Sequence, residues 1–76
     1  MMHAITIYTQ KLCQHCLNAK SLLDIQGLKY KEIKIKDDQA RQQLVAKSGA
    51  STVPQIFING LHIGGYHNLY QLMQQD

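Results

Sequence analysis

The chain's two cysteines, Cys13 and Cys16, are separated only by the polar residues Gln14 and His15. A disulfide across so short a loop removes little entropy from the unfolded chain, so this pair is a poor staple for a small core. In a reducing compartment, a CxxC pair is more often catalytic or metal-binding than a permanent crosslink. The spacing therefore predicts a site of chemistry near the start of the chain.

Length and composition favour one small globular domain over residues 1–76. The chain has 76 residues, of which 45% are hydrophobic, and this leaves no room for a second core. Its amino end lacks a charged segment ahead of an apolar one, and no apolar run approaches the roughly 20 residues that a membrane span needs. We therefore expect a cytoplasmic protein with no membrane partner.

The positive charge is concentrated in one segment. Eight Lys and Arg residues against five Asp and Glu residues give a formal charge of +3. Lysines alternate with apolar residues over residues 28–36, which is typical of a strand with one solvent-exposed face. Lysines on such a strand protect a sheet edge from pairing with other chains. Because no aromatic platform is interleaved with them, we expect no nucleic-acid partner. These lysines are Lys29, Lys31, Lys34 and Lys36.

The first part of the chain reads as a strand followed by a helix. Residues 3–9 alternate in the manner of a strand, and residues 13–27 have helical spacing that ends at Gly27. The apolar stripe of this helix is expected to comprise Cys16, Ala19 and Leu23, widened by Leu17, Leu22 and Ile25.

A second strand and helix follow. In residues 28–36 the apolar phase slips between Tyr30 and Ile33, which indicates a bulge or a late strand start. Asp37 and Asp38 are candidate caps for a helix that ends at Gly49. Its inward residues are expected to be Ala40, Leu44 and Val45.

The last part of the chain reads as a hairpin and a helix. Two short strands meet at Asn59-Gly60, a strong signal for a tight antiparallel turn. Residues 66–75 have helical spacing, and the first two strands must be parallel because a crossover helix joins them. The predicted fold is α/β with the order β-α-β-α-β-β-α. The apolar stripe of the final helix is Tyr66, Leu69, Tyr70 and Met73.

Cys13 is expected at the junction between the first strand and the first helix. Its sulfur would then lie among the unpaired N–H groups and the positive dipole of the helix N-terminus, which lowers a thiol pKa. Lys11 and His15 offer additional positive charge nearby. Cys16 lies one turn later on the apolar stripe, so the pair should be asymmetric, with Cys13 attacking and Cys16 resolving.

Two features of the sequence leave alternatives open. Together with the cysteines, His62 and His67 could supply four zinc ligands, but the separation along the chain is far longer than in a zinc finger, so we expect no metal site. Pro54, the only proline, stands at the start of a strand, and base rates favour a trans bond there.

Three motifs in order, "CQHC", "TVP" and "IGG", resemble those of the dithiol glutaredoxins, members of the thioredoxin-like superfamily, over nearly the whole chain. The resemblance implies a thioredoxin-like fold with a four-stranded mixed sheet flanked by three helices. It also implies that Cys13 is the nucleophile, that Cys16 is the resolving cysteine, and that Pro54 is cis and packs against them.

The resemblance also implies a glutathione site. The backbone of Val53 would pair with the substrate peptide, Arg41 would hold the glycine carboxylate, and the N–H groups of Gly64 and Gly65 would take the γ-glutamyl carboxylate. Besides Gly64, the residues expected to contact glutathione are Lys11, His15, Arg41, Thr52, Val53, Pro54, Gly65, Tyr66 and His67.

The chain departs from the family pattern at three places. Gln10 stands where the family usually has a lysine three positions before the first cysteine, and Lys11 beside it is a candidate substitute. Gln14-His15 replaces the usual Pro-Tyr, so His15 either influences Cys13 or is simply exposed. The third departure is in "GGYHNL", where Tyr66, His67 and Asn68 remove the acidic group that would pair with the α-amino group of glutathione.

The expected function is glutathione-dependent thiol–disulfide oxidoreduction, with glutathione as co-substrate and disulfide-bearing or glutathionylated proteins as partners of a monomeric enzyme. Two alternatives remain. One is a redoxin reduced by a flavoprotein reductase. The other, suggested by Gln14 in place of proline, is a carrier of a glutathione-ligated iron–sulfur cluster.

Overall fold

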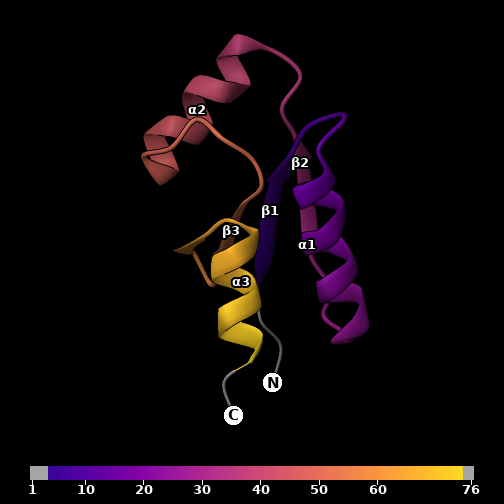
Figure 1. Ribbon diagram of the computed structural model, residues 1–76. Coiled ribbons are helices and arrows are strands. Elements are labelled where there is room, and N and C mark those ends of the chain that lie inside the picture. The colour runs from indigo at the N-terminus through magenta and orange to yellow at the C-terminus, as the bar shows by residue number, and fades with distance from the viewer. Residues whose placement is uncertain (1–3, 75–76) are drawn as a thin grey trace.

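The structure is a computed structural model that describes residues 4–74. A four-stranded mixed sheet has the strand order β2-β1-β3-β4, with β1 and β2 parallel and the other neighbouring pairs antiparallel. This arrangement, drawn in Figure 1, confirms the predicted fold and the predicted parallel and hairpin pairings. The elements are β1 (Ile5–Thr9), α1 (Gln14–Ile25), β2 (Lys31–Lys34), α2 (Asp38–Ser48), β3 (Gln55–Ile58), β4 (Leu61–Gly64) and α3 (Tyr66–Met73).

The central strand β1 is covered on both faces. Ile5 and Ile7 belong to a core cluster with residues of α1 and α3, whereas Tyr8 belongs to a second cluster with Ile35 and with Leu44 of α2. Successive side chains of a strand point to opposite faces, so the two clusters lie on opposite sides of the sheet. Figure 1 accordingly shows α2 set apart from α1 and α3.

The phase slip before β2 marks a late strand start. The pairing of β2 with β1 begins at Lys31 and runs to Lys34 without interruption, so this pair contains no bulge. Tyr30 packs against the α1 and α3 cluster, whereas Ile33 packs against the α2 cluster. The apolar phase changes because the segment serves both faces of the sheet. A register shift occurs instead between β3 and β4, at Ile56/Phe57.

The helix ends follow the sequence signals. The Asp37 carboxylate caps α2 by accepting a hydrogen bond from the Ala40 N–H at 2.8 Å, and Gly49 ends this helix with a left-handed φ of 75°. Gly27 follows Gln26, the C-cap residue of α1, and also has a positive φ. No helix within residues 4–74 is both long and apolar enough to cross a membrane.

Four residues expected on apolar stripes are instead exposed. The buried positions of α1 form one narrow stripe, and α2 buries a single residue, Leu44. The broader stripes were wrong because each helix contacts the sheet along one line of side chains and leaves its flanks in solvent. The exposed residues are Leu17 (55% exposed), Ile25 (77%), Val45 (41%) and Tyr70 (43%).

One polar cluster joins three elements beside the end of β1. The Glu32 carboxylate of β2 accepts a hydrogen bond from the Thr9 hydroxyl at 2.6 Å and pairs with the Lys20 ammonium of α1 at 2.9 Å. The hydrogen bonds from Thr9 and Lys20 lower the pKa of Glu32 below its usual value. Because Thr9 itself is buried, this cluster connects the end of β1 and the edge strand β2 to α1.

A Glu32→Gln variant tests this cluster. We expect it to lower the free energy of unfolding by about 1 kcal/mol at neutral pH, because both charge-assisted interactions weaken. The folded pKa lies below the usual value of 4.5, so this stabilisation is present above pH 4.5 and is lost as the pH falls through the folded pKa. Urea unfolding by circular dichroism at neutral pH and at about pH 2.5 measures it. A wild-type advantage of equal size at both pH values would contradict the assignment.

Candidate active site

Cys13 lies where the sequence predicts, between β1 and α1. It is the N-cap residue of α1 and has an extended backbone. Its sulfur accepts a hydrogen bond from the Cys16 N–H at 3.1 Å, so it satisfies one of the unpaired donors at the helix N-terminus. In the reduced protein, this donor and the helix dipole stabilise negative charge on the same sulfur.

The two cysteines differ in accessibility as predicted. Cys16 is 2% exposed and lies on the buried stripe of α1, whereas Cys13 is half-buried. The two form a disulfide, and their Cα atoms are 5.2 Å apart, within the usual range for such a bond. A substrate can therefore reach Cys13 from solvent, and Cys16 can act only from the inner side.

The loop before β3 packs against the reactive cysteine. The Val53-Pro54 peptide bond is cis, as the resemblance implied, and Pro54 is buried. The Cys13 sulfur lies 3.9 Å from the carbonyl oxygen of Val53, a contact rather than a hydrogen bond because this sulfur is in the disulfide. The hydroxyl of exposed Thr52 accepts a hydrogen bond from the side-chain amide of Gln55 at 3.3 Å.

The start of α3 is built against this loop. A Cβ atom on Gly65 would lie 3.4 Å from the carbonyl oxygen of Pro54. Gly64 has a φ of 123°, and a Cβ atom there would come within 2.5 Å of the Asn68 side-chain oxygen, so only glycine fits. The same oxygen of Asn68 accepts a hydrogen bond from the Gly65 N–H at 3.1 Å. Asn68 therefore occupies one of the backbone donors that the sequence assigned to a glutathione carboxylate.

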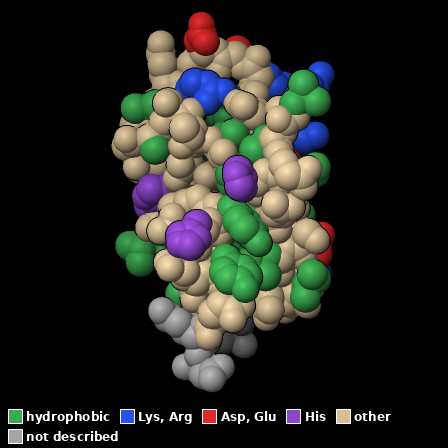
Figure 2. Space-filling model, in the orientation of Figure 1, with side chains coloured by type: hydrophobic (Ala, Val, Ile, Leu, Met, Phe, Trp, Pro, Cys, Tyr) green, Lys and Arg blue, Asp and Glu red, His purple; other side chains and the backbone are tan. Residues whose placement is uncertain are grey.

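An aromatic contact connects the two helix N-termini. The His15 ring of α1 stacks on the Tyr66 ring of α3, with centroids 6.1 Å apart and planes 27° apart. Tyr66 in turn contacts Tyr70, with centroids 6.1 Å apart. Figure 2 shows histidine and hydrophobic side chains next to one another on this face of the molecule. His15 is exposed and lies between the two cysteines in the sequence, so its ring and that of Tyr66 form one side of the site.

Arg41 connects the two loops that flank the cysteines. Its guanidinium donates to the Ser51 carbonyl oxygen and to the Gln10 side-chain oxygen. Ser51 precedes the cis-proline loop and Gln10 follows β1, so the arginine stands at the edge of the site. Lys11 is exposed and lines the same hollow as Cys13. His67 is exposed on the first turn of α3.

Sequence reasoning missed the structural roles of three residues. Asn68 could have been found, because an amide three residues after a helix N-cap commonly folds back on the cap. Gln10 gave no signal, since its partner Arg41 is distant in the sequence. Leu12 has a left-handed φ of 56°, which leucine strongly disfavours, so nothing in its residue type predicted this conformation.

The zinc alternative has no site within residues 4–74, where no three His, Cys, Asp or Glu side chains lie close enough to hold a metal ion. The His62 ring instead forms a 2.7 Å hydrogen bond with Gln55 and contacts the Phe57 ring, with centroids 5.0 Å apart.

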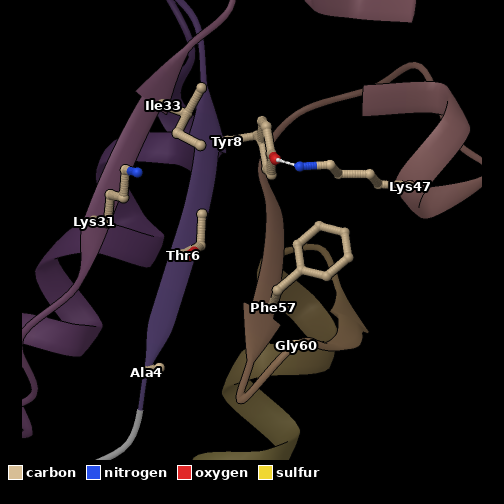
Figure 3. Close-up of a pocket in the computed structure, with 8 residues that line it drawn as sticks. All are labelled: Ala4, Thr6, Tyr8, Lys31, Ile33, Lys47, Phe57 and Gly60. Carbon is tan, nitrogen blue, oxygen red and sulfur yellow. Dashed lines mark hydrogen bonds between the residues drawn. The ribbon is translucent and has the colours of Figure 1, made fainter. Parts of the chain in front are cut away.

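A separate hollow of about 460 Å³ lies on the α2 face of the sheet (Figure 3). The Lys47 side chain reaches from α2 toward Tyr8, and its ammonium donates to the Tyr8 hydroxyl at 3.3 Å. None of the predicted site residues lines it, so it is not part of the cysteine site. Its lining residues are Ala4, Thr6, Tyr8, Lys31, Ile33, Lys47, Phe57 and Gly60.

Comparison with known proteins agrees with this geometry. Residues 5–63 match the family model described as Glutaredoxin. Glutaredoxin 3 of Escherichia coli K12 is 43% identical over 93% of this chain and 87% of its own length, and glutaredoxin 1 of Rickettsia prowazekii is 40% identical over 99% and 82%.

Solved structures show the same fold. The solution structure of a glutaredoxin from Brucella melitensis is 38% identical, has a TM-score of 0.82, and is matched over 95% of this chain and 79% of that one. The buckwheat glutaredoxin–glutathione complex is 26% identical, has a TM-score of 0.84, and is matched over 95% and 69%. The chain thus belongs to the glutaredoxin family, and its Cys13–Cys16 pair makes it a thiol–disulfide oxidoreductase.

Proposed function

We propose that the enzyme uses glutathione as its reductant and acts as a cytoplasmic monomer on disulfide-bearing or glutathionylated proteins. The observation that carries the chemistry is the position of the Cys13 sulfur as N-cap acceptor of α1, with Cys16 buried one turn behind it. A nucleophilic thiol needs a stabilised thiolate and access to substrate, and Cys13 has both.

The reaction proceeds by two exchanges. The Cys13 thiolate attacks the glutathionyl sulfur of a mixed disulfide, and the substrate thiolate leaves and takes a proton. A glutathione thiolate then attacks the new Cys13–glutathione bond, which yields oxidised glutathione and restores the Cys13 thiolate. With a protein disulfide, Cys16 attacks the mixed disulfide instead, and two glutathione molecules later reduce the Cys13–Cys16 bond.

The residues around Cys13 suit a peptide with two carboxylates. The Val53 backbone, beside the Cys13 sulfur, would pair with the peptide backbone of glutathione. Arg41 at the outer edge would bind one carboxylate, since a guanidinium has five N–H donors and two partners leave capacity for a third. The N-terminus of α3 would attract the other carboxylate, because unpaired N–H groups and the helix dipole favour an anion there.

A second candidate reductant follows from one observation. In this chain, neutral Asn68 folds back on Gly65 at the point where the family has an acidic segment. Without that negative charge the α-amino group of glutathione has no ion-pair partner there, and a flavoprotein reductase could replace glutathione.

Single-cysteine variants test the roles and the reductant together. In a glutathione-coupled assay with a small glutathionylated substrate, we expect Cys13→Ser to lose activity by more than about a thousandfold, because the nucleophile is gone. Cys16→Ser should stay active, because glutathione itself resolves the intermediate. Circular dichroism and thiol titration serve as folding controls. A folded wild type that turns over no substrate with glutathione would reject glutathione and favour the reductase.

An Asn68→Asp variant tests whether the missing charge limits glutathione binding. The carboxylate can still accept the Gly65 N–H and also attracts the ammonium of glutathione, so we expect KM for glutathione to fall by about two- to fivefold, the range of an exposed ion pair. Asn59→Asp in the β3–β4 turn makes the same charge change away from the site and should leave KM unaltered. An equal fall in both variants would show a general charge effect and contradict the assignment.

A further inference from the structure

Leu12, directly before the reactive cysteine, is in an unusual position for a leucine. Its φ of 56° is left-handed, and its side chain is fully exposed. Left-handed backbone is unfavourable for a residue with a bulky side chain, and an exposed leucine gains nothing from burial in return. Folding alone therefore does not account for leucine here, where asparagine or glycine would fit the backbone better.

A second exposed leucine lies on the same side of the cysteines. Leu17 on the first turns of α1 is 55% exposed, although the spacing predicted that it would be inward. Leu12, Leu17, Cys13 and Cys16 all line one hollow of about 270 Å³. We call Leu12 and Leu17 the leucine pair. A molecule seated in this hollow would touch both leucines while its sulfur meets Cys13.

The surroundings of the leucine pair are mainly cationic. Lys11, Lys20 and Lys34 line the hollow, and Glu32 is its one acidic lining residue. Lys20 is already paired with Glu32, so Lys11 and Lys34 supply the net charge. The hollow therefore presents apolar side chains rimmed by positive charge, which is complementary to an apolar residue beside an acidic one.

This hollow lies beside the place proposed for glutathione and shares Cys13 and Lys11 with it. The other proposed glutathione residues lie on the side of Cys13 toward the cis-proline loop and the N-terminus of α3. The leucine pair instead shares its hollow with residues of β2, at the opposite edge of the sheet from β4. Consecutive Cα atoms of a bound peptide are only about 3.8 Å apart. The residues on either side of the substrate cysteine that reacts with Cys13 must therefore lie over the surface around Cys13.

We propose that the leucine pair, rimmed by Lys11 and Lys34, docks the protein part of the substrate and selects cysteines flanked by an apolar and an acidic residue. This inference rests on thiol–disulfide exchange at Cys13 but not on glutathione as the reductant. It assigns substrate selection to a surface that contacts the protein rather than the glutathionyl group.

Stoichiometric exchange with peptide disulfides tests the surface without glutathione. The Cys13 thiolate attacks one sulfur of a disulfide-linked peptide dimer and releases one peptide thiol; Cys16 then attacks Cys13 and releases the second, which leaves the enzyme oxidised. The two substrates are dimers of acetyl-Gly-Asp-Cys-Leu-Gly-amide and of acetyl-Gly-Asn-Cys-Ser-Gly-amide. Chromatography of acid-quenched samples gives each rate, and the rate with dithiothreitol corrects for intrinsic reactivity.

We expect the corrected rate of the wild type to be about fivefold higher for the Asp-Leu peptide, a modest apolar contact. In the double variant Leu12→Asn, Leu17→Ser this ratio should fall to about two, because the apolar contact is gone and only the attraction of Lys11 and Lys34 for the aspartate remains. Asparagine tolerates left-handed backbone, so Leu12→Asn alone should not lower Tm. If Leu12 were needed for folding, the same substitution would lower Tm. Ile25→Ser removes another exposed apolar side chain, 77% exposed, at the far end of α1 and should keep the ratio.

Three results would overturn the proposal. A wild-type ratio near one would show that the surface does not discriminate, and a ratio that persists in the double variant would show that other residues do. Failure of the folded, reduced wild type to exchange with either peptide would reject chemistry at Cys13 and the docking surface together.

Discussion

The register between β1 and β3 is the constraint on which the site depends. Tyr8 lies opposite Gln55 in this antiparallel pair, so the end of β1 and the start of β3 meet at one end of the sheet. The loop that leads from β1 to Cys13 is thereby brought to the cis-proline loop that precedes β3. A shift of one residue would turn every side chain of β1 to the other face and remove the cysteine from its partner loop.

That register is fixed because β1 cannot slide without loss of burial on both faces. Ile7 is fully buried against α1 and α3, and Tyr8 is almost fully buried toward α2. Most antiparallel sheets have one solvated face, which would fix only every second side chain. Here the side chains on both faces of β1 are buried, and the ion pair of Lys20 with Glu32 adds a polar connection between α1 and β2. The site can therefore carry a left-handed leucine because the frame beneath it is fixed independently.

Sequence patterns predicted those parts of the molecule that follow from local chemistry. The caps at Asp37 and Gly49 and the turn at Asn59-Gly60 each depend on a few adjacent residues, and all appear as expected. The position of Cys13 followed from the change of period between strand and helix. The exposure of Leu17 and Val45 did not follow, because a helical pattern shows which residues could face a core but not how wide a core the neighbours provide.

Contacts between distant segments were predictable only in part. The cis bond at Pro54 opposed the base rate and was expected only from the resemblance to a family. The contacts of Arg41 with Gln10 and Ser51, and the stack of His15 on Tyr66, join residues that share no local pattern. Such pairs are set by the register of the sheet, which one sequence does not reveal.

The two sides of Cys13 present different chemistry to a substrate. On the side toward α3, the surface beside Cys13 consists of the stacked His15 and Tyr66 rings and of the neutral Asn68 side chain. Toward β2 it is apolar and cationic, with the leucine pair and Lys34. A disulfide that reacts at Cys13 has two substituents, and the geometry allows each to meet a different surface. In the proposed reaction with glutathione, the weaker electrostatic attraction of its amine on the α3 side leaves a larger share of the discrimination to contacts with the protein substrate on the β2 side.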